Sequence, residues 1–106
     1  MSKRKTDRYI KRLEAVFTAG AEKYWGTTSD LSAQGMFIRT LHALVPGTVL
    51  DIEIHLPDNG ISKVRGKVRR AIRTQITGIR NGMGIDLIET DDNYIELVKK
   101  IQEERL

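Results

Sequence analysis

The organisation of this chain follows from one stretch, Ser29-Asp30-Leu31-Ser32-Ala33-Gln34-Gly35-Met36-Phe37-Ile38-Arg39-Thr40. Asp30 and Ser32 favour a turn, because their side chains bond nearby backbone groups, and Gly35 can adopt a positive φ without steric cost. The apolar run that follows is typical of a strand that enters a core. We therefore expect Asp30 and Ser32 to lie at a bend and to face away from that core, where two fixed polar groups would form a ligand site. An Asx-turn that only joins two strands is the alternative interpretation.

A basic segment precedes this stretch. Arg4 and Arg8 stand four residues apart, and Arg12 repeats the step. The spacing alone has little specificity, because Arg65 and Arg69 show it as well. The order of the features is far more specific: a basic N-terminal arm comes first, one strand follows, and the D-x-S-x-x-G turn comes next.

This combination resembles the PilZ domain, a bacterial receptor module for the second messenger cyclic di-GMP. In the register that the resemblance favours, Arg4 and Arg8 form the motif pair, and Arg8 with Arg12 is the shifted alternative. The first register is preferred because Tyr9 and Leu13 then occupy the family's aromatic and first core positions. The similar segments cover nearly the whole chain: 8–17 for the second motif arginine and first strand, 30–40 for the central motif, and 44–48 and 82–85 for later turn and strand signatures.

Composition indicates a single domain with an anionic partner. The 106 residues form one domain, 1–106, with room for one core. The formal net charge of +4 favours an anionic partner over a cationic one. The absence of cysteine excludes disulfides and thiolate metal sites, and no stretch has the character of a secretory signal or a bilayer-spanning helix. We therefore expect a soluble, cytoplasmic protein without membrane insertion.

Alternating apolar residues predict antiparallel strands along most of the chain. The first strand begins at Arg12, and Leu13, Ala15 and Phe17 would face inward from it. A returning strand is expected to contain Trp25, which we interpret as a packing residue rather than a base-stacking surface. The remaining elements are a hairpin at 19–22, the returning strand at 24–29, strands at 48–56, 64–73 and 84–88, a turn at 57–60, and a bulge at 69–70.

Near the C-terminus the apolar period changes to that of a helix. Four residues fall on one stripe, which should cover an open end or side of the sheet: Tyr94, Leu97, Val98 and Ile101. The predicted fold is all-β with one C-terminal helix. It consists of a flexible basic arm (1–11), a six-stranded antiparallel PilZ-type (split) β-barrel (12–89) and a helix (91–104). Closure into a barrel would remove exposed strand edges.

The resemblance implies a cyclic di-GMP site in which the arm closes over a ligand held at the turn. The planar guanidinium of arginine bonds phosphate or guanine O6 and N7 and stacks on a base, whereas the carboxylate of Asp30 would accept from guanine N1–H and the N2 amine. Ser32 would donate to a phosphate or hold the turn, and Gly35 would shape the backbone. The predicted ligand-binding residues are Arg4, Arg8, Asp30, Ser32 and Gly35, with Lys3, Lys5 and Arg12 as further candidates.

Three functions fit this sequence. The leading hypothesis is a cyclic di-GMP receptor or adaptor that acts on a downstream protein partner, and the resemblance implies motility or biofilm regulation. The second is a ligand-free PilZ-like adaptor, and the third is nonspecific nucleic-acid binding with steep salt dependence; sequence-specific nucleic-acid binding is not expected. We expect no enzyme, because no nucleophile–base pair or Walker-type glycine loop is present. No metal or cofactor is expected, since neither His42 nor His55 has a second ligand at a useful spacing.

Overall fold

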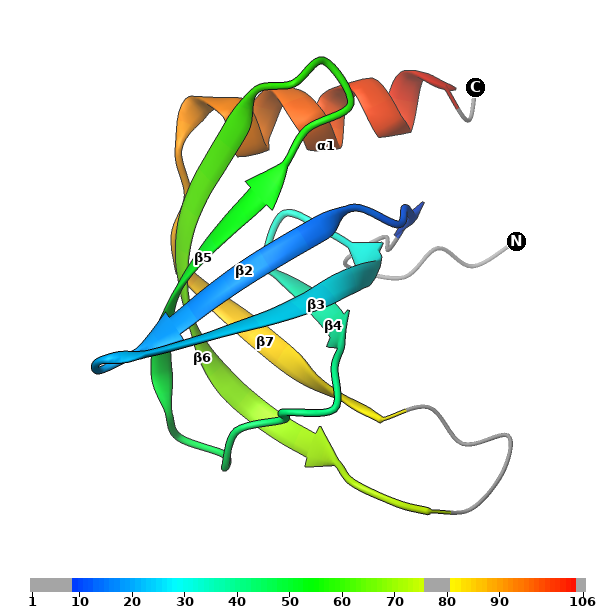
Figure 1. Cartoon of the computed structure of the whole chain (residues 1–106). Helices are drawn as coiled ribbons and strands as arrows, with labels where there is room; N and C mark the ends of the chain where they lie inside the picture. Colours follow the sequence, from blue (N-terminus) through cyan, green and yellow to red (C-terminus); the bar gives the residue numbers. More distant parts are fainter. Residues whose placement is uncertain (1–8, 76–80, 105–106) are drawn as a thin grey trace.

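A computed structural model describes residues 9–75 and 81–104 of the chain. Seven strands and one helix follow one another within these ranges (Figure 1). They are β1 (Tyr9–Ile10), β2 (Glu14–Ala19), β3 (Glu22–Leu31), β4 (Gly35–Arg39), β5 (Val49–His55), β6 (Ile61–Ile72), β7 (Gly82–Glu89) and α1 (Asp92–Glu104).

Six of these strands close into a barrel. The sheet order is β1-β3-β2-β5-β6-β7-β4, every pairing is antiparallel, and β4 also pairs with β3, so that strands β2 to β7 form a ring. Closure leaves no long unpaired edge among these strands, which is the physical reason for a barrel in a domain of this size. The predicted six-stranded antiparallel barrel with one C-terminal helix is therefore confirmed. The two-residue strand β1, which pairs with the end of β3, falls in the segment assigned to the basic arm from sequence.

The core fills the barrel and continues beneath the helix. On β5, Leu50, Ile52 and Ile54 are almost completely buried, whereas Asp51 and His55 between and after them are exposed. Figure 1 shows α1 lying across one end of the barrel. Its buried side chains are those of the predicted apolar stripe, Tyr94, Leu97, Val98 and Ile101, so the expectation that this stripe covers an open end is confirmed.

The predicted turns and the bulge are also present. Gly20 has a φ of 62° in the β2–β3 hairpin, and Asn59 has a φ of 71° in the β5–β6 turn, where Asp58 Oδ1 accepts from the Gly60 backbone at 2.9 Å. Both are left-handed conformations that glycine and asparagine tolerate. In β6 the register shifts between Val68 and Arg70, which is the bulge expected from the slip in apolar period.

The interpretation of Trp25 as a packing residue is wrong. Its side chain is 64% exposed on the outer face of β3. The neighbouring Tyr24 takes the inward position and stacks on Phe17 with ring centroids 5.4 Å apart. Because successive strand residues point to opposite faces, an inward Tyr24 requires an outward Trp25. Because Tyr24 and Trp25 are both aromatic, the sequence pattern does not indicate which of them faces the core.

Asp91 fixes the start of α1 and its attachment to β6. One carboxylate oxygen accepts from the Tyr94 backbone at 2.9 Å and from the Ser62 hydroxyl at 2.7 Å, and the other accepts from the Lys63 backbone at 2.7 Å. Partial burial alone would raise the pKa of Asp91, but these hydrogen bonds outweigh it and lower the pKa below its ordinary value.

The stabilisation by Asp91 is therefore expected to depend on pH. Asp91→Ala should lower the free energy of unfolding by about 1–2 kcal/mol at pH 7, as loss of a helix cap does. The carboxylate is fully ionised above its unfolded pKa of about 4, and its contribution is lost as the pH falls through the lower pKa of the folded state. Urea titrations at pH 7 and pH 3 should show a difference between wild type and variant that shrinks in acid. Asp92→Ala is the matched control; a loss for Asp91→Ala that is equal at both pH values would contradict the prediction.

Candidate functional site

The D-x-S-x-x-G turn joins β3 to β4 and is held by its own side-chain bonds. The Ser32 hydroxyl donates to the Gly35 carbonyl at 3.1 Å and accepts from the Gly35 backbone N–H at 3.0 Å. The Ser32 backbone N–H donates to the same Gly35 carbonyl at 2.9 Å. These bonds fix the reversal of the chain before Gly35 begins β4 and pairs with Asp86 of β7.

Ser32 does not face away from the core, and the expectation that it does is wrong. Its side chain is 1% exposed, and its hydroxyl is occupied by bonds within the turn. A buried hydroxyl needs such partners, and here the turn supplies them. Of the two roles foreseen for Ser32, the structure places it in the one that holds the turn.

Asp30 faces outward because of a bulge in β3. The register between β3 and β4 shifts between Thr28 and Asp30, and both Thr28 and Leu31 are fully buried. Without the extra residue, strict alternation would direct Asp30 inward together with Thr28. The bulge reverses the phase and re-aims the carboxylate to the outer face, where Asp30 is half-buried. A bulge beside a polar motif is a common device at binding sites.

The end of the segment predicted as the basic arm is joined to β3 at this same point. Tyr9 pairs with Leu31, and Ile10 pairs with Asp30. The buried Thr28 hydroxyl donates to the Lys11 carbonyl at 2.6 Å and accepts from the Leu13 backbone N–H at 2.9 Å. The chain therefore enters the barrel directly beside the outward carboxylate.

The other predicted site residues divide into two groups. Arg12 is exposed in the link between β1 and β2. The remaining four lie outside the described residues: Lys3, Arg4, Lys5 and Arg8.

Helix α1 is tied to the turn by a buried hydrogen bond. The Tyr94 hydroxyl donates to the Ser32 carbonyl at 2.6 Å, and the Tyr94 side chain is 1% exposed. The contact joins residues 62 positions apart in the sequence. The turn is thus held on one side by its own hydroxyl and on the other by the helix that closes the barrel.

Phe37 belongs to the apolar run that is expected to enter the core, but the structure places it on the outer face. It pairs with Asp30 across β3 and β4 and is half-buried, while its neighbours Met36 and Ile38 are fully buried. Alternation of apolar and polar residues would have indicated which side chains of 36–38 face outward. All three residues are apolar, so the sequence shows no such alternation. Phe37 is thus an aromatic ring beside the predicted ligand-binding carboxylate.

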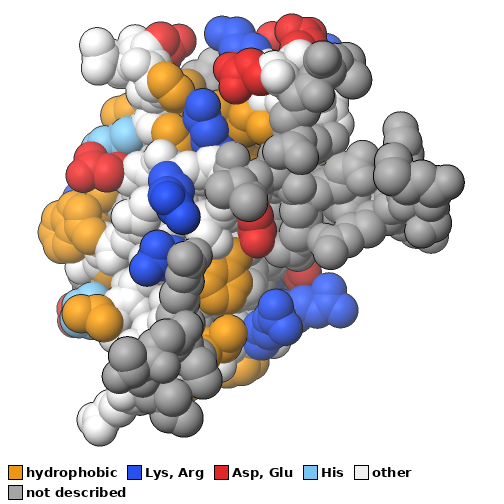
Figure 2. Space-filling view, turned by 90° about the vertical axis from the view of Figure 1, so that its right-hand side faces the viewer, with side chains coloured by type: hydrophobic (Ala, Val, Ile, Leu, Met, Phe, Trp, Pro, Cys, Tyr) orange, Lys and Arg blue, Asp and Glu red, His pale blue; other side chains and the backbone are white. Residues whose placement is uncertain are grey.

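Basic side chains are spread over one face of the barrel. Figure 2 shows lysine and arginine side chains in several separate groups on this face, with apolar and acidic side chains between them.

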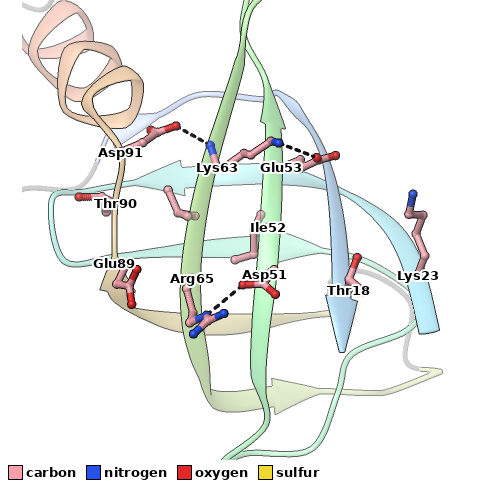
Figure 3. Close-up of a pocket in the computed structure, with 11 residues that line it drawn as sticks. Thr18, Lys23, Asp51, Ile52, Glu53, Lys63, Arg65, Glu89, Thr90 and Asp91 are labelled. Carbon is pink, nitrogen blue, oxygen red and sulfur yellow. Dashed lines mark hydrogen bonds and ion pairs between the residues drawn. The ribbon is translucent and has the colours of Figure 1, made fainter. Parts of the chain in front are cut away.

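A separate cavity of about 520 Å³ lies on the outer face of β5 and β6. Its charged side chains largely pair with one another: Arg65 Nε lies 3.0 Å from Asp51 Oδ1, and Lys63 Nζ lies 4.0 Å from Glu53 Oε1 (Figure 3). The hydrogen bond from Arg65 to Asp51, together with the charge of that carboxylate, raises the pKa of Arg65. Since the cavity includes none of the predicted ligand-binding residues and most of its charges are matched, the turn at Asp30 is the stronger candidate.

Metal-binding clusters and membrane-spanning helices are both absent from the described part of the chain. Residues 9–75 and 81–104 contain no group of three or more histidine, aspartate or glutamate side chains that could hold a metal ion. Within the same ranges, no helix has both the length and the apolar character needed to cross a bilayer.

The sequence matches the family model described as the PilZ domain over residues 2–102. The chain belongs to the PilZ domain family. This family comprises cyclic di-GMP receptors and adaptors, which are binding domains rather than enzymes. A comparison with curated protein sequences gives no match.

Two solved structures resemble this PilZ domain. The Bacillus subtilis inhibitor of motility MotI/DgrA matches with a TM-score of 0.80 and 17% identity, covering 99% of this chain and 52% of that one. The PilZ domain of Escherichia coli YcgR with cyclic di-GMP matches with a TM-score of 0.73 and 16% identity, covering 94% of this chain and 88% of that one. At these identities the similarity shows a shared fold. This chain spans about half the length of the Bacillus protein.

Proposed function

We propose that this PilZ domain is a cytoplasmic receptor for cyclic di-GMP, in which Arg4 and Arg8 close over a ligand bound beside Asp30 and the complex acts on a protein partner. One observation carries this proposal: the bulge in β3 turns Asp30 outward at the place where β1, which follows Arg8 in the chain, pairs with β3. The residues that directly follow Arg8 are therefore paired with β3 beside the Asp30 carboxylate.

The chemistry of the ligand matches this arrangement. Cyclic di-GMP carries two phosphates and two guanines, so a receptor needs positive charge together with groups that recognise base edges. Arginine can bond a phosphate or the guanine O6 and N7, and a carboxylate accepts from guanine N1–H and N2. Gly35 shapes the turn rather than contributing a side chain, and Ser32 acts through its position in that turn. Lys3, Lys5 and Arg12 are candidates for additional contacts to phosphate.

A ligand-free adaptor is the second candidate, and two observations favour it. The Ser32 hydroxyl already makes both a donated and an accepted bond within the turn. Trp25 is 64% exposed on the outer face, and exposed tryptophan is a frequent anchor of protein interfaces. In either case we propose that output passes through a protein partner. Because a motility inhibitor shares the fold, control of motility is our first choice of process, with biofilm formation as the alternative.

Calorimetric titration with cyclic di-GMP at moderate salt separates these candidates. We expect saturable binding that excess GTP and single-stranded RNA do not displace, with a stoichiometry of one or two ligands per chain. Binding to nucleic acid would instead weaken steeply as salt rises. A titration without heat, repeated at a second temperature to exclude an accidental zero enthalpy, would contradict the receptor and leave the ligand-free adaptor.

A further inference from the structure

Four residues from four strands form one row across the outside of the barrel. Asp30 on β3 pairs with Phe37 on β4, Phe37 pairs with Gly84 on β7, and Gly84 pairs with Arg70 on β6. Directly paired residues share one face of a sheet. The row lies outside because the residues on either side of Phe37 and of Gly84 are buried: Met36, Ile38, Met83 and Ile85.

Gly84 in this row and Gly82 beside it have no side chains, and neighbouring side chains occupy the space above them. A Cβ placed on Gly82 would lie 2.5 Å from Phe37 Cε1, so the phenyl ring rests where a side chain at 82 would stand. A Cβ on Gly84 would lie 3.4 Å from Arg70 Cγ and 3.6 Å from its Nε, so the arginine side chain lies over Gly84. Beyond Gly84 the surface is hollowed by about 270 Å³ between Arg69, Arg70 and Asp86.

The row therefore presents a carboxylate, an aromatic ring and a guanidinium in that order. Neighbouring strands lie roughly 4.8 Å apart, so three steps separate Asp30 from Arg70 by roughly 14 Å at the backbone. The long Arg70 side chain shortens that gap, because it lies over Gly84 on β7. In the row, Phe37 stands between the two charged residues.

We propose that Phe37 is the surface on which one guanine of cyclic di-GMP stacks, with Asp30 bonding the N1–H and N2 edge of the base and Arg70 bonding the O6 and N7 edge. This inference rests on the proposed function. Guanine carries donors on one edge and acceptors on the other, which is the order of acceptor and donor along the row. Adenine has an acceptor at N1, where Asp30 needs a donor, and it has a donor at N6 beside the N7 acceptor, where Arg70 needs two acceptors. The row thus selects guanine over adenine.

The Phe37 ring also covers Gly82, so a role in packing must be distinguished from a role in ligand binding. Phe37→Leu keeps most of the apolar volume and removes the aromatic face, whereas Phe37→Tyr keeps the face. Under our proposal Phe37→Leu folds normally but binds cyclic di-GMP about 5- to 150-fold more weakly, the range found for loss of one base–aromatic stack. Phe37→Tyr binds within about threefold of the unaltered protein, allowing for ordinary variation between similar side chains.

The experiment is calorimetric titration of the unaltered protein, Phe37→Leu, Phe37→Tyr and Arg70→Gln, each with cyclic di-GMP and with cyclic di-AMP. We expect the unaltered protein to prefer the guanine ligand and Arg70→Gln to lose much of that preference, while Arg65→Gln, on the same strand but outside the row, retains it. No binding by the unaltered protein would overturn the proposed function and this inference together. If the unaltered protein binds cyclic di-GMP and Phe37→Leu binds it with the same affinity, this inference alone would be overturned.

A spectroscopic readout reports the stack directly. In Trp25→Phe the chain has no other tryptophan, so adding Phe37→Trp creates a single reporter in the row. Stacking of guanine on the indole should quench its fluorescence in proportion to the bound fraction found by calorimetry. Binding at full stoichiometry with unchanged emission would overturn the proposal. A tryptophan introduced at the exposed Val45, in the Trp25→Phe background, serves as the control and should not respond.

Discussion

Replacing Tyr94 by alanine is expected to lower the free energy of unfolding by about 3–5 kcal/mol, the range for removal of a buried aromatic side chain. Tyr94 is 1% exposed and belongs to the apolar cluster that joins α1 to the barrel. The substitution creates a cavity and also leaves the Ser32 carbonyl without its 2.6 Å donor. Because domains of this size are stable by only about 5–15 kcal/mol, this loss should be visible as a large drop in the urea midpoint.

Two matched variants separate the ring from its hydroxyl. Tyr94→Phe removes only the donor to Ser32 and should cost about 1–2 kcal/mol, the penalty for a buried acceptor left unsatisfied. Ile95→Ala, on the adjacent and exposed position of the same helix, should change stability by about 0.5 kcal/mol or less, as surface substitutions usually do. If Tyr94→Ala cost no more than Ile95→Ala, the helix would not be anchored through Tyr94.

The same hydroxyl connects the helix to the candidate binding site. Ser32 fixes the turn that follows the outward-facing Asp30, and its carbonyl is held by Tyr94. Loss of the tie in Tyr94→Phe should therefore increase amide hydrogen exchange at the turn, at Gly35 above all, because the N–H of that residue donates within the turn. Stability of the helix contact and rigidity of the turn are two effects of one hydrogen bond.

Most of the fold could be predicted from periodicity and turn chemistry. The strict alternation of Leu50, Ile52 and Ile54 fixed the face of β5, and the stripe through Tyr94 and Ile101 identified the helix. Failures arose where the alternation is ambiguous. Tyr24 and Trp25 are both aromatic, so only the register of the closed barrel decides which one is inward.

The candidate site was less accessible from sequence than the fold. The motif predicted the same outward orientation for Asp30 and Ser32. In the structure a bulge directs Asp30 outward, whereas Ser32 is buried in the turn. No short sequence pattern distinguishes these two orientations. The row through Phe37, Gly84 and Arg70 was missed because it depends on the pairing of β4 with β7, which are distant in the sequence, and on the register between β6 and β7. Long-range register of this kind follows from closure of the barrel and not from any short motif.

The second large effect is expected on ligand affinity. Asp30→Ala and Arg8→Ala should each weaken cyclic di-GMP binding by about 10- to 150-fold, because each removes a charge-assisted contact of about 1.5–3 kcal/mol. Calorimetric titration measures the affinity, and thermal unfolding without ligand establishes that the barrel remains folded. Asp58→Ala, in the exposed β5–β6 turn, is the matched control for loss of one carboxylate and should bind normally.

Three arginine variants decide which pair acts in the site. If Arg4 and Arg8 are the motif pair, Arg4→Ala should weaken binding about as much as Arg8→Ala, while Arg12→Ala should remain within a few-fold of the unaltered protein. Arg12 is exposed in the link between β1 and β2. Because the preceding residues Tyr9 and Ile10 are paired with β3, the position of Arg12 is fixed by the sheet. The shifted register predicts the reverse ranking of Arg4 and Arg12. Normal affinity in both Arg8→Ala and Asp30→Ala would remove these residues from the site, because Arg8 is common to both registers.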